Sequence, residues 1–263
     1  LSLSLSLSLS TFDLTRISAQ VLKRMQNPSE QNLIDVIRGL RDAERVEEAV
    51  QMLDRYLRTA TAAQKQTMVL REMAPHLNVD AFDTVFRACV DTNLTPPRQF
   101  VHRHFKALFS EQSMSAAPRL EEYLHTTGND NAQKELIIGL YIDAAVATKN
   151  FAAALDCFQA HPSLFAEAHV VAVSRAAAQH KHHRTVETLA RLVQTTSLSR
   201  KTQEAVMLDR IRVYKQLGQL NDVVETLWTD IFAVMQPSKE FVLEACSLWE
   251  GDNNAVRSSP VHE

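Results

Sequence analysis

The sequence is poor in glycine and lacks segments with the alternation of a β-strand. Only five of its 263 residues are glycine. Half-buried strands alternate polar and apolar side chains, and no stretch after the first ten residues does so convincingly. Both shortages favour an all-α protein.

Cysteine is also scarce, and the three that occur are far apart. Cys89, Cys157 and Cys246 cannot form a CxxC pair, and each stands among apolar neighbours at helical spacing. We predict three buried, reduced thiols; a disulfide or a metal site is the alternative. Reduced thiols indicate a reducing compartment: the cytosol, the nucleus or the mitochondrial matrix.

The sequence has no long apolar run and no excess of charge. No run approaches the roughly 18–20 residues of a membrane span. A net charge of −3 gives no general attraction to nucleic acid or to an anionic membrane, so any contact with a polyanion would be local. The 45% of hydrophobic residues is enough for a buried core.

The chain contains none of the short catalytic motifs that we searched for: a P-loop, GxSxG, HExxH or GxGxxG. The tract His180-Lys181-His182-His183 invites a metal interpretation. Its lysine would repel a cation, and no cysteine or acidic cluster has matching spacing, so we interpret it as a turn between helices. We expect no enzymatic activity, no cofactor, no metal and no small-molecule substrate.

What the chain does contain is a repeated pair of amphipathic helices. In residues 205–235, two apolar series with helical spacing flank a break at Leu217-Gly218-Gln219. Such a helical hairpin cannot bury its apolar face alone and needs neighbouring copies, and the pattern of its second helix recurs about every 35 residues. The predicted second helices begin at Val46, Val79, Ala117, Phe151, His182 and Leu220. Asp83 is a polar misfit in the second of these patterns.

A further amphipathic run precedes each of the later second helices. These predicted first helices span 62–74, 97–110, 131–147, 165–179 and 203–217. Breakers such as Pro162 and Pro237 fall where a second helix has ended and a new helix begins. A last run from Phe241 to Trp249 would cap the stack, and we interpret Trp228 and Trp249 as packing residues.

The ends of the chain differ from the repeats. Residues 1–10 read LSLSLSLSLS, an alternation that a CT dinucleotide repeat encodes, and we predict a disordered, low-complexity leader. Residues 11–26 are basic and amphipathic, which fits either the remnant of a mitochondrial presequence or an ordinary capping helix. We expect a single repeat domain over 11–250 and a flexible tail over 251–263.

The hairpins resemble the pentatricopeptide and tetratricopeptide repeat superfamily. The best match is YKQLGQLNDVVETL at 214–227, which is similar to the family pattern Y-x-K-x-G-x-x-x-E-A-x-x-L/F with one extra residue before the glycine. Weaker matches are ATKNFAAALDCF at 147–158 and DAERVEEAVQML at 42–53. The resemblance implies a right-handed α-solenoid of about six helical hairpins. The period favours the pentatricopeptide type, and the uneven spacing leaves the subfamily open.

One departure from the family limits what the resemblance implies for function. Pentatricopeptide proteins read one RNA base per repeat with polar residues early in each first helix. The corresponding positions here are Asp35, Met68, Lys106, Leu140, Val171 and Asp209. Three of them are apolar and cannot hydrogen-bond a base edge, so we expect no base-by-base code. The resemblance implies instead a scaffold in a mitochondrial ribosome or RNA-processing complex, like degenerate members of the family in kinetoplast-bearing protists.

Basic side chains gather in two stretches that could touch RNA phosphates. Residues 181–217 carry eight Lys and Arg against three acids, and a smaller patch covers 98–119. The alternative is an ordinary solvated surface. The candidate RNA or partner contacts are Lys181, Arg184, Arg200, Lys201, Arg210, Arg212 and Lys215, together with Arg98, Arg103 and Lys106; Arg119, His102 and His104 belong to the smaller patch.

The sequence therefore predicts a non-catalytic helical-repeat scaffold that binds protein subunits of a larger complex. Direct RNA binding through phosphate contacts and a cytosolic tetratricopeptide-type adaptor for peptide tails are the alternatives. The expected location is the mitochondrial matrix, or otherwise the cytoplasm, and we expect no membrane partner.

Overall fold

The computed structural model describes residues 30–42, 45–59, 63–112 and 114–257, which form helices joined by short connections, and no strand occurs among them. The all-α prediction is confirmed for this part of the chain. The helices are α2 (Glu30–Asp42), α3 (Val46–Thr59), α4 (Ala63–Met73), α5 (Val79–Asp91), α6 (Arg98–Ser110), α7 (Ala116–Thr126), α8 (Asn131–Ala147), α9 (Phe151–Ala160), α10 (Glu167–Gln179), α11 (His183–Thr195), α12 (Arg200–Gln216), α13 (Leu220–Val234) and α14 (Lys239–Arg257), with a 3-10 turn, η1 (Ala74–His76), after α4.

The predicted hairpin pattern agrees closely with the observed helices. The six predicted second helices are α3, α5, α7, α9, α11 and α13, and each begins within one residue of its predicted start. The predicted first helices over 62–217 correspond to α4, α6, α8, α10 and α12. The agreement follows from the clear apolar stripes and from the turn residues that separate them.

One turn geometry recurs between the helices of residues 130–257 and closes the hairpins. An N–H donates to a carbonyl five residues earlier, the bond of a Schellman motif, at distances of 2.8–2.9 Å. These bonds run from Asn150 to Ala145, from His182 to Ala177 and from Gln219 to Tyr214. The residue before each donor has a positive φ: 60° at Lys149, 56° at Lys181 and 68° at Gly218. The tract His180–His183 is thus a turn, as predicted.

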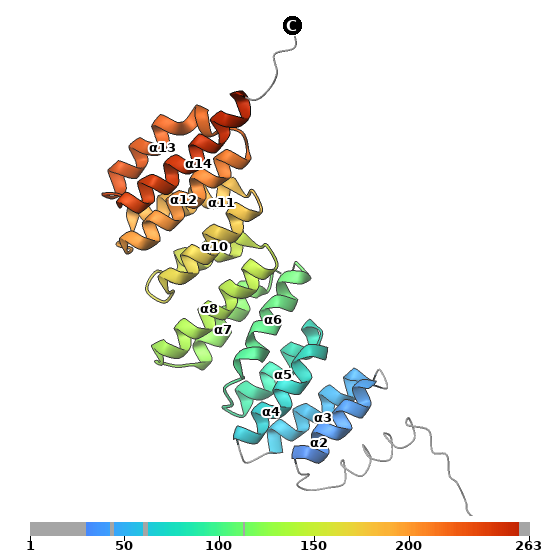
Figure 1. Cartoon of the computed structure of the whole chain (residues 1–263). Coiled ribbons are helices and arrows are strands. Elements are labelled where there is room, and N and C mark those ends of the chain that lie inside the picture. Colours follow the sequence, from blue (N-terminus) through green and yellow to red (C-terminus); the bar gives the residue numbers. More distant parts are fainter. Residues whose placement is uncertain (1–29, 43–44, 60–62, 113, 258–263) are drawn as a thin grey trace, which may run out of the picture. The chain divides into compact units, whose positions relative to one another are not determined.

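The chain divides into two compact units, unit 1 (residues 1–129) and unit 2 (residues 130–263). In unit 1, α2 packs against α3 and α4, α3 against α5, and α4 and α5 against α6 (Figure 1). The packed faces are lined by buried apolar residues such as Leu53 and Phe82. Each helix therefore contacts its near neighbours along the chain.

Unit 2 repeats this arrangement with greater regularity. The first helices α8, α10, α12 and α14 pack successively against one another, and α9, α11 and α13 pack beside them (Figure 1). Its core includes Tyr141, Val173 and Met207, all at most 2% exposed. Packing between helices two elements apart is what stacked hairpins require.

Some expectations for the ends and the cysteines need correction. Helix α14 continues to Arg257, so residues 251–257 are helical, where we expected a flexible tail. Cys89 and Cys157 are buried as predicted, whereas Cys246 is exposed on α14. The predicted leader, 1–10, and the basic segment, 11–26, lie outside the described residues.

Candidate functional site

Three basic residues predicted to contact RNA are engaged within unit 2. Arg210 is 8% exposed and holds Glu187 at 2.6 Å and Asp230 at 2.7 Å. Arg212 pairs with Asp209 and with Glu244. Burial disfavours the charged guanidinium and by itself would lower its pKa. The contacts with the two carboxylates outweigh burial, so the pKa of Arg210 is raised. The sequence pattern could not reveal Glu187, Asp230 and Glu244 as partners because they lie on other helices.

Lys215 completes this internal arrangement. Its ammonium group donates to the backbone carbonyl of Leu248 on α14. Arg200 pairs with Glu204 one turn later, at 3.0 Å. The pair of Arg200 and Glu204 lies within α12, whereas Lys215 and Arg212 connect α12 to α14. Their predicted contact with RNA would compete with these bonds.

The remaining predicted cations of unit 2 are on the surface. Lys181 lies in the turn between α10 and α11, Arg184 follows in the first turn of α11, and Lys201 lies in the first turn of α12. All three side chains are exposed. They remain candidates for contact with a polyanion.

The smaller basic patch divides into an exposed part and a buried part. Arg98, Arg103 and Lys106 are exposed on α6. His104, on the same helix, is fully buried, and Arg119 on α7 is only 8% exposed. The exposed cations stay available to a partner, whereas His104 and Arg119 belong to the core.

His104 and Arg119 meet Asp83 and Tyr123 in a buried polar cluster. Asp83 Oδ2 lies 2.7 Å from Arg119 Nη2, and the Tyr123 hydroxyl lies 2.9 Å from His104 Nδ1. Asp83 Oδ1 is 3.1 Å from His104 Nε2, although the angle is not that of a hydrogen bond. Arg119 also pairs with Glu122 and lies over the ring of Phe86.

The electrostatics of this cluster fit a structural role. Burial lowers the pKa of His104 and raises that of Tyr123 well above its usual value. Burial alone would raise the pKa of Asp83, but contacts with His104 and Arg119 outweigh it and lower the pKa. Phe82 stacks on the His104 ring at 5.0 Å. Both the His104 imidazole and the Tyr123 phenol are fully buried in this cluster.

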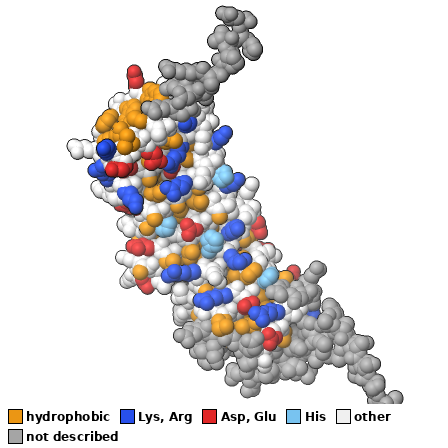
Figure 2. Space-filling view, in the orientation of Figure 1, with side chains coloured by type: hydrophobic (Ala, Val, Ile, Leu, Met, Phe, Trp, Pro, Cys, Tyr) orange, Lys and Arg blue, Asp and Glu red, His pale blue; other side chains and the backbone are white. Residues whose placement is uncertain are grey.

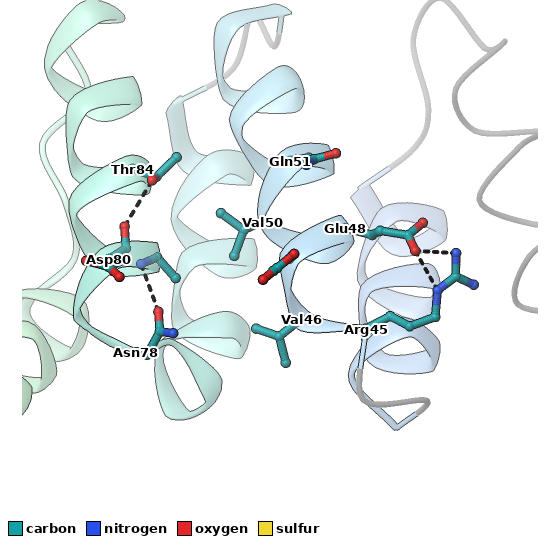
Figure 3. A pocket seen from close by; sticks show the side chains of 10 residues that line it. Arg45, Val46, Glu48, Val50, Gln51, Asn78, Asp80 and Thr84 are labelled. Atoms are coloured by element: carbon teal, nitrogen blue, oxygen red, sulfur yellow. Dashed lines mark hydrogen bonds and ion pairs between the residues drawn. The ribbon is translucent and has the colours of Figure 1, made fainter.

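An open groove of about 760 Å³ lies between α3 and α5 in unit 1. Figure 3 shows Val46, Val50 and Gln51 on one wall and Asp80 and Thr84 on the other. Asn78 caps α5 by accepting from the Ala81 N–H at 2.9 Å, which fixes the start of the second wall. The groove therefore lies between the N-terminal halves of two successive second helices.

The charge of this groove is mainly negative. Glu47 and Asp80 are exposed, and within the described residues neither forms an ion pair. Glu48 is held by Arg45, whose Nε donates to it at 2.6 Å (Figure 3). Val46, Val50 and Ala81 supply apolar surface between the acids. Such a lining suits a segment with basic and small apolar side chains.

A second, smaller groove of about 390 Å³ lies in unit 2 between α9 and α11. Leu155, Leu192 and Arg191 contribute to its lining. It too lies between successive second helices. No sequence pattern marks either groove, because each is formed by two helices that are far apart in the sequence.

Other classes of site leave no sign in the described part of the chain. No group of His, Cys, Asp or Glu there is placed to hold a metal ion. None of the described helices combines the length and apolar character that a membrane span needs. No protein-family model matches the chain, and no curated protein shows significant similarity to it.

Proposed function

We propose that the protein is a non-catalytic helical-repeat adaptor that binds a segment of another protein. The observation that carries the proposal is the open α3–α5 groove, lined by apolar side chains and by the exposed acids Glu47 and Asp80, which form no ion pair with the residues that the structure describes. Stacked hairpins commonly present such extended surfaces. The solenoid arrangement and a setting in a mitochondrial ribonucleoprotein complex are part of this proposal, and both rest on the repeat pattern and its resemblance.

Charge reversal in the groove tests this function. In the variant Glu47→Lys with Asp80→Lys, a partner segment with basic side chains would be repelled. The control reverses Glu135 and Asp143, two exposed acids of α8, and changes the net charge equally. Each tagged full-length chain is purified from native cells, and co-purifying proteins are quantified by mass spectrometry.

We expect the wild type and the control to retain a stoichiometric protein partner that the groove variant loses. Crosslinking of that partner to α3 or α5 would place it in the groove. Retention of the same partner by all three chains, without crosslinks to these helices, would overturn the groove as the binding site. Purification of the wild type without any stoichiometric protein would overturn the adaptor function.

A second candidate function is RNA binding through phosphate contacts. It is supported by Arg98, Arg103 and Lys106, which are exposed and form no ion pair with the described residues. Lys181 and Arg184 add exposed charge in unit 2. Phosphate contacts need local positive potential rather than a base-reading pattern.

This candidate predicts RNA affinity that falls steeply with salt. Reversal of Arg98, Arg103 and Lys106 to Glu would weaken binding of a mixed-sequence RNA by at least about tenfold. Filter binding at several salt concentrations measures both effects. Affinity unchanged by these substitutions would rule out the α6 cations as the RNA site.

A further inference from the structure

Among the described helices of unit 2, α14 has fewer packing neighbours than its counterpart α12. Helix α12 packs against α10 and α11 and also against α13 and α14, whereas α14 packs mainly against α12. Both helices follow a serine N-cap, Ser199 for α12 and Ser238 for α14. Aligning the two N-caps therefore defines the equivalent positions of α12 and α14.

In that register, equivalent positions of α12 and α14 differ in exposure. Met207 is fully buried in α12, whereas its counterpart, Cys246, is exposed in α14. Leu208 is buried, whereas its counterpart Ser247 is exposed. Residues 246 and 247 of α14 therefore add to a surface whose equivalents in α12 are buried.

Exposed apolar side chains occur on α13 and α14. Phe232 is 63% exposed and stacks on the half-buried Trp228, with ring centroids 5.7 Å apart. Leu243 on α14 is 60% exposed. Figure 2 shows hydrophobic side chains gathered over α13 in this part of unit 2. Side chains this large and exposed commonly mark a binding surface.

The charges beside these residues indicate the kind of partner. Residues 220–250 carry Lys239 against six acids, of which Asp230 and Glu244 pair with Arg210 and Arg212. Glu225 shares a helical face with Trp228 and Phe232, and Glu240 lies one turn before Leu243. Both glutamates are exposed and unpaired among the described residues.

We propose that the α13–α14 surface binds an amphipathic helix of a partner protein whose apolar face is flanked by Lys or Arg. That helix would lie with its apolar face on Phe232 and Leu243 and its cations near Glu225 and Glu240. The inference rests on the proposed adaptor function and names a second surface with its class of partner.

Binding of designed peptides to the full-length chain tests this surface. One labelled peptide of about 18 residues, long enough to form a helix, carries an apolar stripe flanked by Lys. Its match carries the same stripe flanked by Glu. The protein variants are Phe232→Ser and Leu243→Ser, with Met114→Ser as the control because Met114 is 96% exposed in unit 1.

We expect the Lys-flanked peptide to bind at least about tenfold more tightly than the Glu-flanked peptide by fluorescence anisotropy. Phe232→Ser and Leu243→Ser should each weaken binding about tenfold, whereas Met114→Ser should leave it unchanged. Cys246 gives an independent measurement, since it is the one exposed cysteine of the three. Saturating Lys-flanked peptide should slow its reaction with a maleimide.

Equal binding of the two peptides, absence of binding, or binding unaffected by Phe232→Ser and Leu243→Ser would overturn the proposal. So would self-association of the chain that Phe232→Ser abolishes, because the occupant would then be a second copy. Failure here is distinguishable from failure of the adaptor function. A partner that is lost from the Glu47 and Asp80 variant would still support that function if the peptides did not bind.

Discussion

The two units hold their helices together with polar contacts of different kinds. Unit 1 concentrates them in one buried cluster, where Asp83, His104 and Arg119 meet. Unit 2 has a buried arginine of its own, Arg210, which pairs with Glu187 and Asp230, and adds contacts between successive first helices at sequence separations of 32 to 35 residues. Unit 1 has exposed ion pairs at similar separations, such as Arg38 with Glu72.

The contacts of unit 2 follow the repeat, and two of them are alike. On α10, Glu167 accepts from the backbone N–H and hydroxyl of Ser199, the N-cap of α12. On α12, Glu204 accepts from the N–H of Ser238 at the start of α14. A carboxylate of one first helix thus holds the N-cap of the next. We infer that the periodic contacts distribute stability over several junctions between helices, whereas the Asp83 cluster concentrates it in one place.

The largest effect should come from removing the central acid of the cluster. Asp83→Ala leaves the buried His104 and Arg119 without their shared partner, and we expect a loss of about 3 kcal/mol. Hydrogen exchange should rise across α5, α6 and α7 and stay unchanged in α10–α14. Asp80→Ala, on the exposed face of the same helix, is the matched control. Equal effects of the two substitutions would mean that the cluster does not stabilise unit 1.

Acidification should destabilise unit 1 at a higher pH than unit 2, and we expect this effect to be smaller than that of Asp83→Ala. The pKa of His104 is below its usual 6.5, so as pH falls the unfolded chain takes up the proton before the folded one. Its contribution is fully present above about pH 6.5 and decreases below it. The hydrogen bonds of Ser199 and Thr202 lower the pKa of Glu167 below 4.5, so that contribution is lost only in more acidic solution.

Unit 1 should therefore lose protection from hydrogen exchange between about pH 6.5 and 4.5, before unit 2 does. His104→Gln, which retains hydrogen-bonding capacity but does not titrate, should remove this early loss. If both units lost protection together in the wild type, His104 would not set the pH response.

A single junction of unit 2 should contribute less than the cluster. Glu167→Ala removes the acceptor for Ser199 and Thr202, and we expect a loss of about 1 kcal/mol. The change in exchange should be confined to the start of α12. Glu135→Ala, at an exposed position of α8, serves as the control. A loss as large as that of Asp83→Ala would contradict the distributed stability that we infer for unit 2.

The smallest effect should be a gain in stability at a hairpin turn. Lys181 adopts a φ of 56°, which glycine tolerates better than lysine, so Lys181→Gly should stabilise the chain by about 0.5–1 kcal/mol. Gly218 has the same turn geometry, and a Cβ added there would meet no atom within 4 Å. Gly218→Ala should therefore destabilise the chain through the positive φ alone. Chemical unfolding of the two variants measures both. A change of the same sign in both would show that the φ angle does not govern these turns.

The helices could be predicted from the sequence because their signal is local. The apolar stripe that begins at Phe151 and the break before it are enough to place α9. The same is true of α13, where Gly218 marks the turn. Helix α14 was predicted too short because its polar residues after 250 resemble those of a tail.

The polar contacts could not be predicted in the same way, since their partners lie on different helices. The sequence signal that pointed to the cluster was Asp83, a polar residue within the apolar pattern of its helix. His104 and Arg119 were assigned to a basic patch because a sequence gives their charge but not their burial. For the same reason Arg210 was expected on the surface, whereas it is buried between Glu187 and Asp230.

The recurring turns have a consequence for the order of folding. Each closing bond spans only five residues, so the chain loses little loop entropy when a hairpin forms. The principal contacts between described helices also join elements that are adjacent or next but one along the chain. Chains with such local contacts fold fast. We therefore expect the hairpins to assemble one after another from the N-terminus while the chain is still being synthesised.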